Sequence, residues 1–194
     1  NLFRKLNINV TKYKEIKNLS DLKNYCQGNE SRYLLKSRRF GYDGKNQLKC
    51  DSNIDFIEKL LSECSCIIEE IVDFSTEVSL VCARQDDNNI IFYPLIENFH
   101  KNGILRYSKF PYINRDLQDT AERYGKELLN YFEYVGVLVI EFFVSKGGKL
   151  VANEIAPRVH NSGHWSIEGS STSQFELHVR AITGDLDNKP IDFK

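Results

Sequence analysis

The chain has 194 residues, of which 41% are hydrophobic and 27% charged, a balance that is typical of a folded globular domain and argues against bulk disorder. Its 26 Lys and Arg residues against 27 Asp and Glu residues give a formal net charge of -1, so no global basic field is available for nucleic acid or anionic lipid. Nucleic acid is therefore not an expected partner. The sequence shows no signal peptide and no apolar run of the roughly 20 residues that cross a bilayer, so a membrane is not an expected partner either. Five scattered cysteines favour the reducing cytoplasm, and the lack of methionine indicates a piece of a longer protein or a processed product.

The first third of the chain is expected to contain short helices and strands. Residues 9–18 are polar with isolated apolar positions and predict an entry segment, after which a short helix begins at Ser20 and ends near Gly28. Asp51-Ser52 predicts the N-cap of a second helix, whose apolar stripe would be Phe56, Leu60 and Leu61. Strands are expected at residues 33–36, 48–50 and 66–71.

The remainder is expected to be richer in strands. Asn114 predicts the start of the clearest helix, because apolar side chains recur there at alternating spacings of four and three, at Leu117, Ala121, Tyr124, Leu128 and Tyr131. A capping box, Ser173-x-x-Glu176, predicts the start of the last helix, which ends at Gly184. Strands or extended pieces are expected at residues 77–84, 90–94, 103–111, 135–144 and 149–155, with a loop at 157–170.

This mixture of helices with antiparallel hairpins, without internal repeats, predicts an α+β protein. Two lobes are expected, the smaller near residues 1–74 and the larger near residues 75–194.

Two glutamates are predicted to face each other across a hairpin. Gly147-Gly148 is a favoured two-residue loop, and in that register Phe143 faces Ala152 and Glu141 faces Glu154. Like charges opposite each other destabilise a sheet, and the apolar run around Glu141 limits relief by solvent. A magnesium ion shared with a polyphosphate would answer this repulsion. A Lys or Arg between the two, a protonated carboxylate, or a register slipped by one residue would answer it as well.

Three further segments carry candidate chemistry. Lys36 leads into a basic, glycine-containing loop that could cradle phosphates, although a solvated hairpin is the commoner reading of such a loop. Arg158, His160 and Asn161 follow the strand of Glu154, where they would suit an anionic substrate; zinc at His160 and His164 is less favoured. Acidic residues at the end of a strand, Glu69 and Glu70 with Glu77 beyond, are usually solvated, and their alternative use is nucleotide recognition.

Motifs over nearly the whole chain resemble the ATP-grasp enzymes, and among these the 5-(carboxyamino)imidazole ribonucleotide synthetases. The most specific is Ala156-Pro-Arg-Val-His-Asn-Ser-Gly-His-Trp165. The others lie in the family's order at residues 36–45, 74–84, 92–95, 97–105, 153–155 and 173–178. Formate-dependent glycinamide ribonucleotide transformylase has a different sequence after its Pro-Arg and ranks second.

The resemblance implies an ATP-grasp fold, in which nucleotide is bound between the antiparallel sheets of two lobes. It implies that ATP phosphorylates bicarbonate to carboxyphosphate and that the 5-amine of 5-aminoimidazole ribonucleotide is then carboxylated. The products would be 5-(carboxyamino)imidazole ribonucleotide, ADP and phosphate, in the purine pathway to IMP. ATP and magnesium are thus the expected cofactors, and a homodimer is the expected full-length assembly.

The resemblance also assigns a nucleotide site to residues of this chain. Lys36 would contact ATP phosphates, Glu77 would hold the ribose, and His100 would lie near the nucleotide. The loop that closes over the phosphates would be Gly41, Tyr42, Asp43, Gly44, Lys45, Asn46 and Gln47, and the adenine would meet Glu69, Glu70, Ile71 and Val72. Glu141 and Glu154 would bind magnesium, assisted by Asn153.

Substrate recognition is assigned in the same way. Tyr42, Asp43 and Lys45 would meet the imidazole ribonucleotide. Arg158, His160 and Asn161 would hold bicarbonate or carboxyphosphate and, with Lys36, form the catalytic group.

This chain departs from the family pattern in two ways. Asn46 stands where glycine is usual, and Lys45 stands where arginine is also common. The family's N-terminal and C-terminal domains are absent from the sequence, so weak ATP binding and slow turnover, or none, are expected. The alternatives are another ATP-grasp ligase and an ATP-binding fragment that catalyses no reaction.

Overall fold

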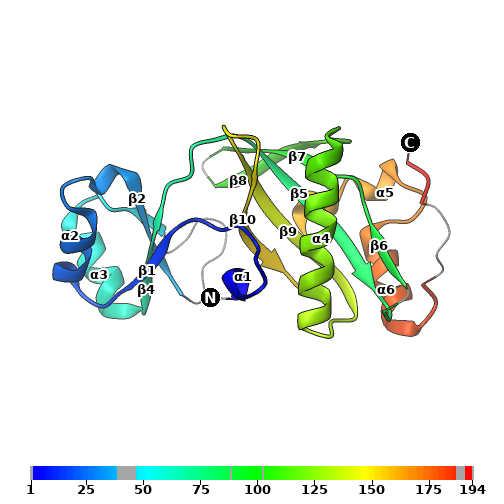
Figure 1. Cartoon of the computed structure of the whole chain (residues 1–194), viewed down its shortest axis with the longest axis horizontal. Coiled ribbons are helices and arrows are strands. Elements are labelled where there is room, and N and C mark those ends of the chain that lie inside the picture. Colours follow the sequence, from blue (N-terminus) through cyan, green and yellow to red (C-terminus); the bar gives the residue numbers. More distant parts are fainter. Residues whose placement is uncertain (1, 39–46, 88, 102, 187–190, 194) are drawn as a thin grey trace. The chain divides into compact units, whose positions relative to one another are not determined.

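The computed structural model describes residues 2–38, 47–87, 89–101, 103–186 and 191–193. The contacts divide the chain into two compact units (Figure 1): a larger one of Asn1–Val10, Phe74–Lys101 and Leu105–Lys194, and a smaller one of Thr11–Asp73 with Asn102–Ile104. Residues 1–10, expected in the smaller lobe, belong to the larger unit. The reason is a long-range pairing, in which the Ala152 N–H donates to the Asn9 carbonyl at 2.8 Å.

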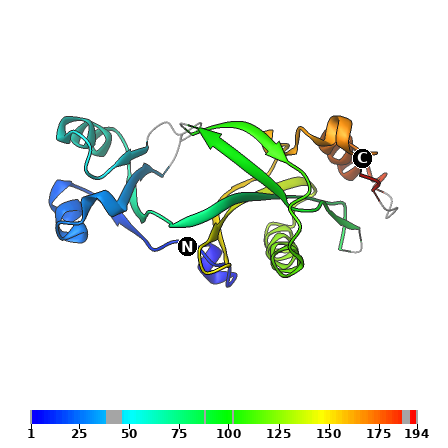
Figure 2. The same cartoon turned by 90° about the horizontal axis from the view of Figure 1, so that it is seen from above.

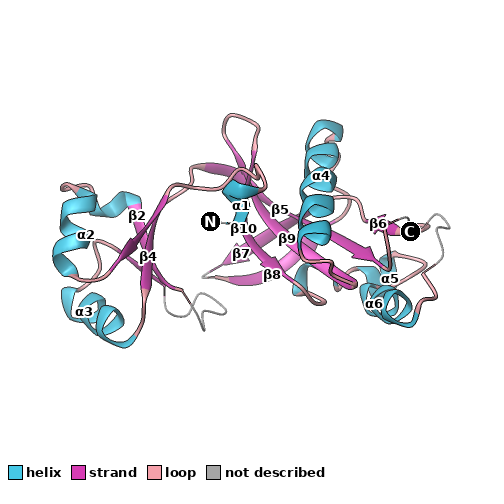
Figure 3. Ribbon diagram, turned by 60° about the horizontal axis from the view of Figure 1, so that its bottom comes forward, coloured by secondary structure: helices cyan, strands magenta, loops and turns pink. Residues whose placement is uncertain are grey.

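The smaller unit is a four-stranded antiparallel sheet with helices on one face (Figure 3). Its strand order is β1-β4-β2-β3, with β1 at Tyr13–Ile16, β2 at Tyr33–Ser37, β3 at Gln47–Lys49 and β4 at Cys66–Glu70. The helices are α2 (Leu19–Cys26) and α3 (Ile54–Glu63), with a 3-10 turn η1 at Glu30–Arg32. Alternating strand residues such as Ile16, Leu35 and Ile68 point toward these helices and form the unit's core.

Several expectations for this unit are wrong in detail. Strand β1 lies inside the expected entry segment 9–18, because pairing with β4 makes a strand of a polar stretch that has little apolar alternation. Asn18 and Asn53 cap the two helices in place of the expected residues, each through its side-chain oxygen. The cap at Asn53 turns Ile57 inward, whereas Phe56, expected in the buried stripe, is 61% exposed.

The larger unit is a six-stranded sheet of order β10-β9-β5-β7-β8, with β6 paired to β5. Its strands are β5 (Phe74–Arg84), β6 (Ile90–Phe92), β7 (Ile96–Lys101), β8 (Ile104–Lys109), β9 (Gly136–Ser145) and β10 (Leu150–Ala156). Its helices are α1 (Leu2–Lys5), α4 (Arg115–Tyr131), α5 (Ser166–Gly169) and α6 (Gln174–Thr183), with a 3-10 turn η2 at Asn161–Gly163. Strand β7 lies where no strand is expected from the sequence, and η2 and α5 lie within the expected loop 157–170.

Helices α4 and α6 cover opposite faces of this sheet (Figure 2). On β5, Val78, Leu80 and Cys82 face α4, while the alternate residues Val81 and Ala83 face α6. Strand β9 repeats this pattern, and its apolar run, expected for a central strand, is buried on both faces.

The two long helices of this unit begin where the sequence predicts. The Asn114 side chain accepts from the Leu117 N–H at 3.1 Å, and the Ser173 hydroxyl accepts from the Glu176 N–H at 3.2 Å. Helix α6 ends at Thr183, and its C-cap Gly184, where the sequence predicts the end, has a φ of 79°, a left-handed value that favours glycine. Among the described residues, no helix combines the length and the apolar character needed to cross a membrane.

Candidate active site

One face of the larger sheet changes from apolar to polar along its strands. On β9, Val139 lies in the core beneath α6, and Glu141 is the next residue on that face. On β5, Ser79 is paired with Glu141, and Glu77 follows on the same face because side chains alternate. The same face therefore has an apolar part, packed on α6, and an adjacent acidic part.

The hairpin that joins β9 to β10 differs from its expected form. The Ser145 N–H donates to the Lys149 carbonyl at 2.9 Å, which closes a three-residue loop at 146–148. The expected two-residue Gly147-Gly148 loop is therefore wrong, and Phe143 lies opposite Val151, not opposite Ala152.

A β-bulge then restores the predicted glutamate pair. The register shifts between Ala152 and Glu154, so Asn153 is an extra residue on β10. Beyond the bulge Glu154 lies directly opposite Glu141, as the sequence predicts. The loop and the bulge each change the register by one residue, and the two changes cancel at this pair.

The His160 imidazole contacts both carboxylates. Its Nδ1 lies 3.7 Å from Oε1 of Glu141, and its Nε2 lies 3.7 Å from Oε1 of Glu154. Burial raises the pKa of the Glu141 carboxyl; His160 opposes this shift, and Glu154 adds to it. The Glu141 side chain is only 13% exposed, whereas that of Glu154 is 55% exposed, so the cost of ionisation falls mainly on Glu141.

The donor set fits a magnesium ion. Oε1 of Glu141 is buried and accepts no hydrogen bond within the described part of the chain, so a ligand-binding lone pair is available. Among the described residues no group of three or more His, Cys, Asp and Glu is arranged to hold a metal. In phosphoryl-transfer sites magnesium is commonly bound by one or two carboxylates, while phosphate oxygens and water fill its remaining coordination positions.

A second acidic contact joins Glu77 to His100. His100 Nδ1 lies 2.7 Å from Oε2 of Glu77, and this contact raises the pKa of His100 against the opposing effect of burial. A buried chain of hydrogen bonds lies on the same face: the Ser108 hydroxyl donates to Asn98 Oδ1 at 2.9 Å, and Asn98 Nδ2 donates to the Ser79 hydroxyl at 2.6 Å. Hydrogen-bonded polar side chains therefore lie beside the acidic residues on this face and hold one another in place.

We expect the Glu77–His100 contact to make stability depend on pH. Because the folded pKa of His100 lies above 6.5, the pair stabilises the fold fully below that pH and loses this effect as the pH rises through the folded pKa. The fall in Tm between pH 6 and pH 8.5 should be smaller in His100→Gln than in the unmodified chain, by on the order of 1–2 °C. His164→Gln, at an exposed site, is the control; an equal change in both variants would contradict the expectation.

In the smaller unit, the predicted nucleotide residues lie on different faces of the sheet. Lys36 and Glu69 share the face away from α2 and α3, with Nζ of Lys36 2.6 Å from Oε2 of Glu69. Glu70 points to the helix-covered face, where Arg32 Nη2 lies 3.0 Å from its Oε1. Adjacent strand residues alternate, so the Glu69 and Glu70 side chains cannot serve one ligand on one face.

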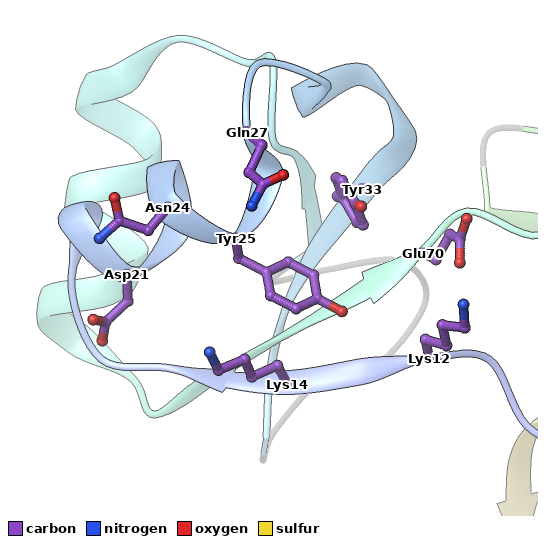
Figure 4. A pocket seen from close by; sticks show the side chains of 8 residues that line it. All are labelled: Lys12, Lys14, Asp21, Asn24, Tyr25, Gln27, Tyr33 and Glu70. Atoms are coloured by element: carbon purple, nitrogen blue, oxygen red, sulfur yellow. The ribbon is translucent and has the colours of Figure 1, made fainter.

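A hollow of about 560 Å³ lies on the helix-covered face of this sheet (Figure 4). Lys12, Lys14, Tyr25 and Tyr33 line it together with acidic side chains that include Glu70. Because basic and acidic groups are balanced in its walls and Lys36 lies on the other face, the hollow adds nothing to a phosphate site.

The other predicted site residues are less informative. Arg158 and Asn161 are exposed on the segment that carries His160, and Arg158 Nη1 donates to the Val159 carbonyl at 2.9 Å. Gln47 is exposed at the start of β3, and Ile71 and Val72 follow β4. The loop residues Gly41, Tyr42, Asp43, Gly44, Lys45 and Asn46 lie outside the described residues.

Sequence reasoning missed the polar side chains that support this site. Ser79 and Asn98 occupy inward positions, and a hydroxyl within the apolar run Val78 to Ala83 was the signal that could have found the first of them. Gln174, Ser162 and Ser166 are fully buried beside the His160 segment, and nothing in their local pattern distinguishes them from surface residues.

With the site's geometry established, comparison with known proteins decides the family. The family model of the ATP-grasp domain matches residues 1–175 of the chain. The chain belongs to the ATP-grasp family. The expected α+β fold of ATP-grasp type is confirmed.

Individual ATP-grasp relatives agree with the expected branch of the family. The N5-carboxyaminoimidazole ribonucleotide synthase of Escherichia coli K12 is 49% identical over 153 residues, 77% of this chain and 42% of that protein. The enzyme of the same name from Pseudomonas aeruginosa PAO1 is 43% identical over 185 residues, 94% of this chain and 51% of that protein. The chain thus spans about half the length of these relatives.

A solved structure has a similar fold. The crystal structure of N5-carboxyaminoimidazole synthetase from Staphylococcus aureus complexed with ADP matches at a TM-score of 0.87 and 33% identity. The match covers 98% of this chain and 52% of that one.

Proposed function

We propose that this chain carries out the ATP-dependent carboxylation of 5-aminoimidazole ribonucleotide, with bicarbonate as the carbon source. The observation that carries the proposal is the Glu141–Glu154 pair with His160 in contact with both, within a fold whose relatives are named for the product of this reaction. The products are 5-(carboxyamino)imidazole ribonucleotide, ADP and phosphate, in purine biosynthesis. A cytoplasmic location and a full-length homodimer stay predictions.

The proposed site works by positioning and charge neutralisation. Lys36 binds ATP phosphates, Glu77 accepts from the ribose hydroxyls, and Glu141 and Glu154 hold magnesium, which when bound offsets the charge of the phosphate oxygens. Phosphoryl transfer needs these contacts more than it needs a covalent nucleophile, and the proposed reaction includes no covalent nucleophile from the protein.

The segment after β10 holds the acceptor in this proposal. Arg158 offers a planar pair of donors to bicarbonate, and His160 and Asn161 hold the carboxyphosphate that forms. The low exposure of Glu141 and His160 supports the exclusion of water, which carboxyphosphate requires because it hydrolyses readily.

Phosphate release by the chain tests the proposal. With ATP and magnesium present, release should require both bicarbonate and 5-aminoimidazole ribonucleotide, even if turnover is slow. Formate with glycinamide ribonucleotide should not replace them; if it does, the chain is the related transformylase. ATP binding without any release would identify a binding module and contradict the proposal.

A further inference from the structure

The Gln174 side chain pairs with the backbone of His160. Its Oε1 accepts from the His160 N–H at 3.0 Å, and its Nε2 donates to the His160 carbonyl at 2.7 Å. Gln174 is the first residue of α6, is fully buried, and lies 14 residues along the chain from its partner. Both ends of one amide are therefore used on a single residue of the segment that follows β10.

The surroundings of Gln174 are built to hold that amide. The Ser166 hydroxyl accepts from the Gln174 N–H at 2.8 Å and donates to the Gly163 carbonyl at 2.6 Å. A Cβ placed on Gly163 would collide with Oε1 of Gln174. Glycine is thus required at position 163 so that the amide can reach His160.

The His160 ring is oriented by a second set of contacts. Its Nδ1 lies 3.0 Å from the Ser162 hydroxyl and accepts from the Ser162 N–H at 3.4 Å. Ser162 is fully buried and lies next to Gly163 in the turn η2. The backbone of His160 and the turn after it therefore decide together where the imidazole points, which is toward Glu141 and Glu154.

We propose that Gln174 is a positioning residue, which acts through the backbone of His160 to hold the imidazole between Glu141 and Glu154. An apolar side chain would fill the same space without fixing the backbone. A buried amide there therefore indicates that the His160 backbone must be held in one orientation. The role of Gln174 in orienting His160 does not depend on the proposed function. Only the expected effect of Gln174 on turnover rests on that function.

The test compares two glutamines that make the same kind of contact. Gln118 on α4 also bridges a backbone segment, since its Oε1 accepts from the Leu95 N–H at 2.7 Å and its Nε2 donates to the Tyr93 carbonyl at 3.1 Å. Gln174→Met and Gln118→Met each remove such a bridge at similar side-chain volume. The second bridge touches none of the proposed site residues, which makes Gln118→Met the matched control.

Hydrogen exchange of assigned backbone amides is the first measurement. In Gln174→Met the His160 amide should exchange at least about tenfold faster, while the Leu177 amide, which donates to the carbonyl of the N-cap Ser173, keeps its rate. In Gln118→Met the His160 rate should not change. An unchanged His160 rate in Gln174→Met, or an equal increase in both variants, would overturn the proposal.

Turnover is the second measurement. Gln174→Met should lower kcat by about 10- to 100-fold, as supporting residues of reactive groups typically do, with the KM for ATP within about threefold. Gln118→Met should stay within about twofold of the unmodified chain in both. An equal loss of kcat in the two variants would show that general destabilisation is responsible and contradict the positioning role.

If Gln174→Met fails to fold, Gly163→Ala provides the second variant, because it displaces the amide without removing it. The same faster exchange at His160 is expected, and an unchanged rate would count against the proposal. If the unmodified chain releases no phosphate, the proposed function fails, whereas the exchange rates still decide the role of Gln174.

Discussion

Replacing Glu141 by glutamine should greatly slow the magnesium-dependent release of phosphate from ATP, measured in the assay of the proposed function, and at the same time stabilise the metal-free protein. The loss of one of the two carboxylates proposed to bind magnesium is expected to lower the rate by at least about 10²-fold. Relief of a buried, unsatisfied charge should raise the stability by on the order of 1 kcal/mol, which is about 2–4 °C in Tm for a chain of this size.

The direction of the stability change follows from the pKa of Glu141. Burial raises that pKa, so the fold favours the protonated carboxyl, and its contribution to stability falls as the pH rises through the folded value. Glutamine carries no charge at any pH and keeps the shape of the side chain. The gain in Tm for Glu141→Gln should therefore be larger at pH 8 than at pH 4.

Two further variants make this result specific. Glu154→Gln should lose activity similarly but leave Tm nearly unchanged, because its side chain is 55% exposed and its charge is solvated. Glu127→Gln, on the exposed side of α4, should change neither property. Unchanged magnesium-dependent phosphate release in Glu141→Gln would show that the metal does not bind at this pair.

Replacing Lys36 by methionine should weaken ATP binding by about 10²-fold. The substitution keeps the apolar stem but removes an ammonium group that the proposed function places on the phosphates, and a hydrogen bond to a charged group contributes roughly 1.5–3 kcal/mol. Calorimetric titration of ATP with magnesium present measures the effect directly. An unchanged Kd would remove Lys36 from the phosphate site.

Lys59→Met is the matched control for this measurement. Lys59 is a lysine of the same unit, on α3, and also lies near a glutamate, with Nζ 4.0 Å from Oε1 of Glu63. Because its side chain is 70% exposed, the substitution should leave both ATP affinity and Tm unaffected. A similar loss of affinity in both variants would point to general electrostatics and not to a specific contact.

How far the sequence could predict the site is clearest at the glutamate pair. The pairing of Glu141 with Glu154 was predictable from their apolar strands and the Gly147-Gly148 turn, yet the exact loop was not. A three-residue loop and a bulge at Asn153 differ from the expected hairpin by local conformations of similar free energy. Strand pairing across the whole sheet selects between them.

The supporting groups were not predictable at all. Gln174 bonds to a residue 14 positions away, and Asn98 on β7 donates to Ser79 on the neighbouring strand β5. Neither contact leaves a local periodic signal in the sequence. Strand β7 was not predicted for the same reason. Apolar and polar residues alternate only weakly along it, and pairing with the neighbouring strands makes it part of the sheet.

By itself the sequence determined the class of fold, the caps of α4 and α6, the central apolar strand β9 and the family to which the chain belongs. These features depend on short-range patterns of polarity and on contiguous motifs. Only the tertiary structure decided that residues 1–10 join the larger unit, that the hairpin contains a bulge, and that a buried amide holds His160. Such features depend on contacts between segments far apart in the chain, whose free energies no local pattern records.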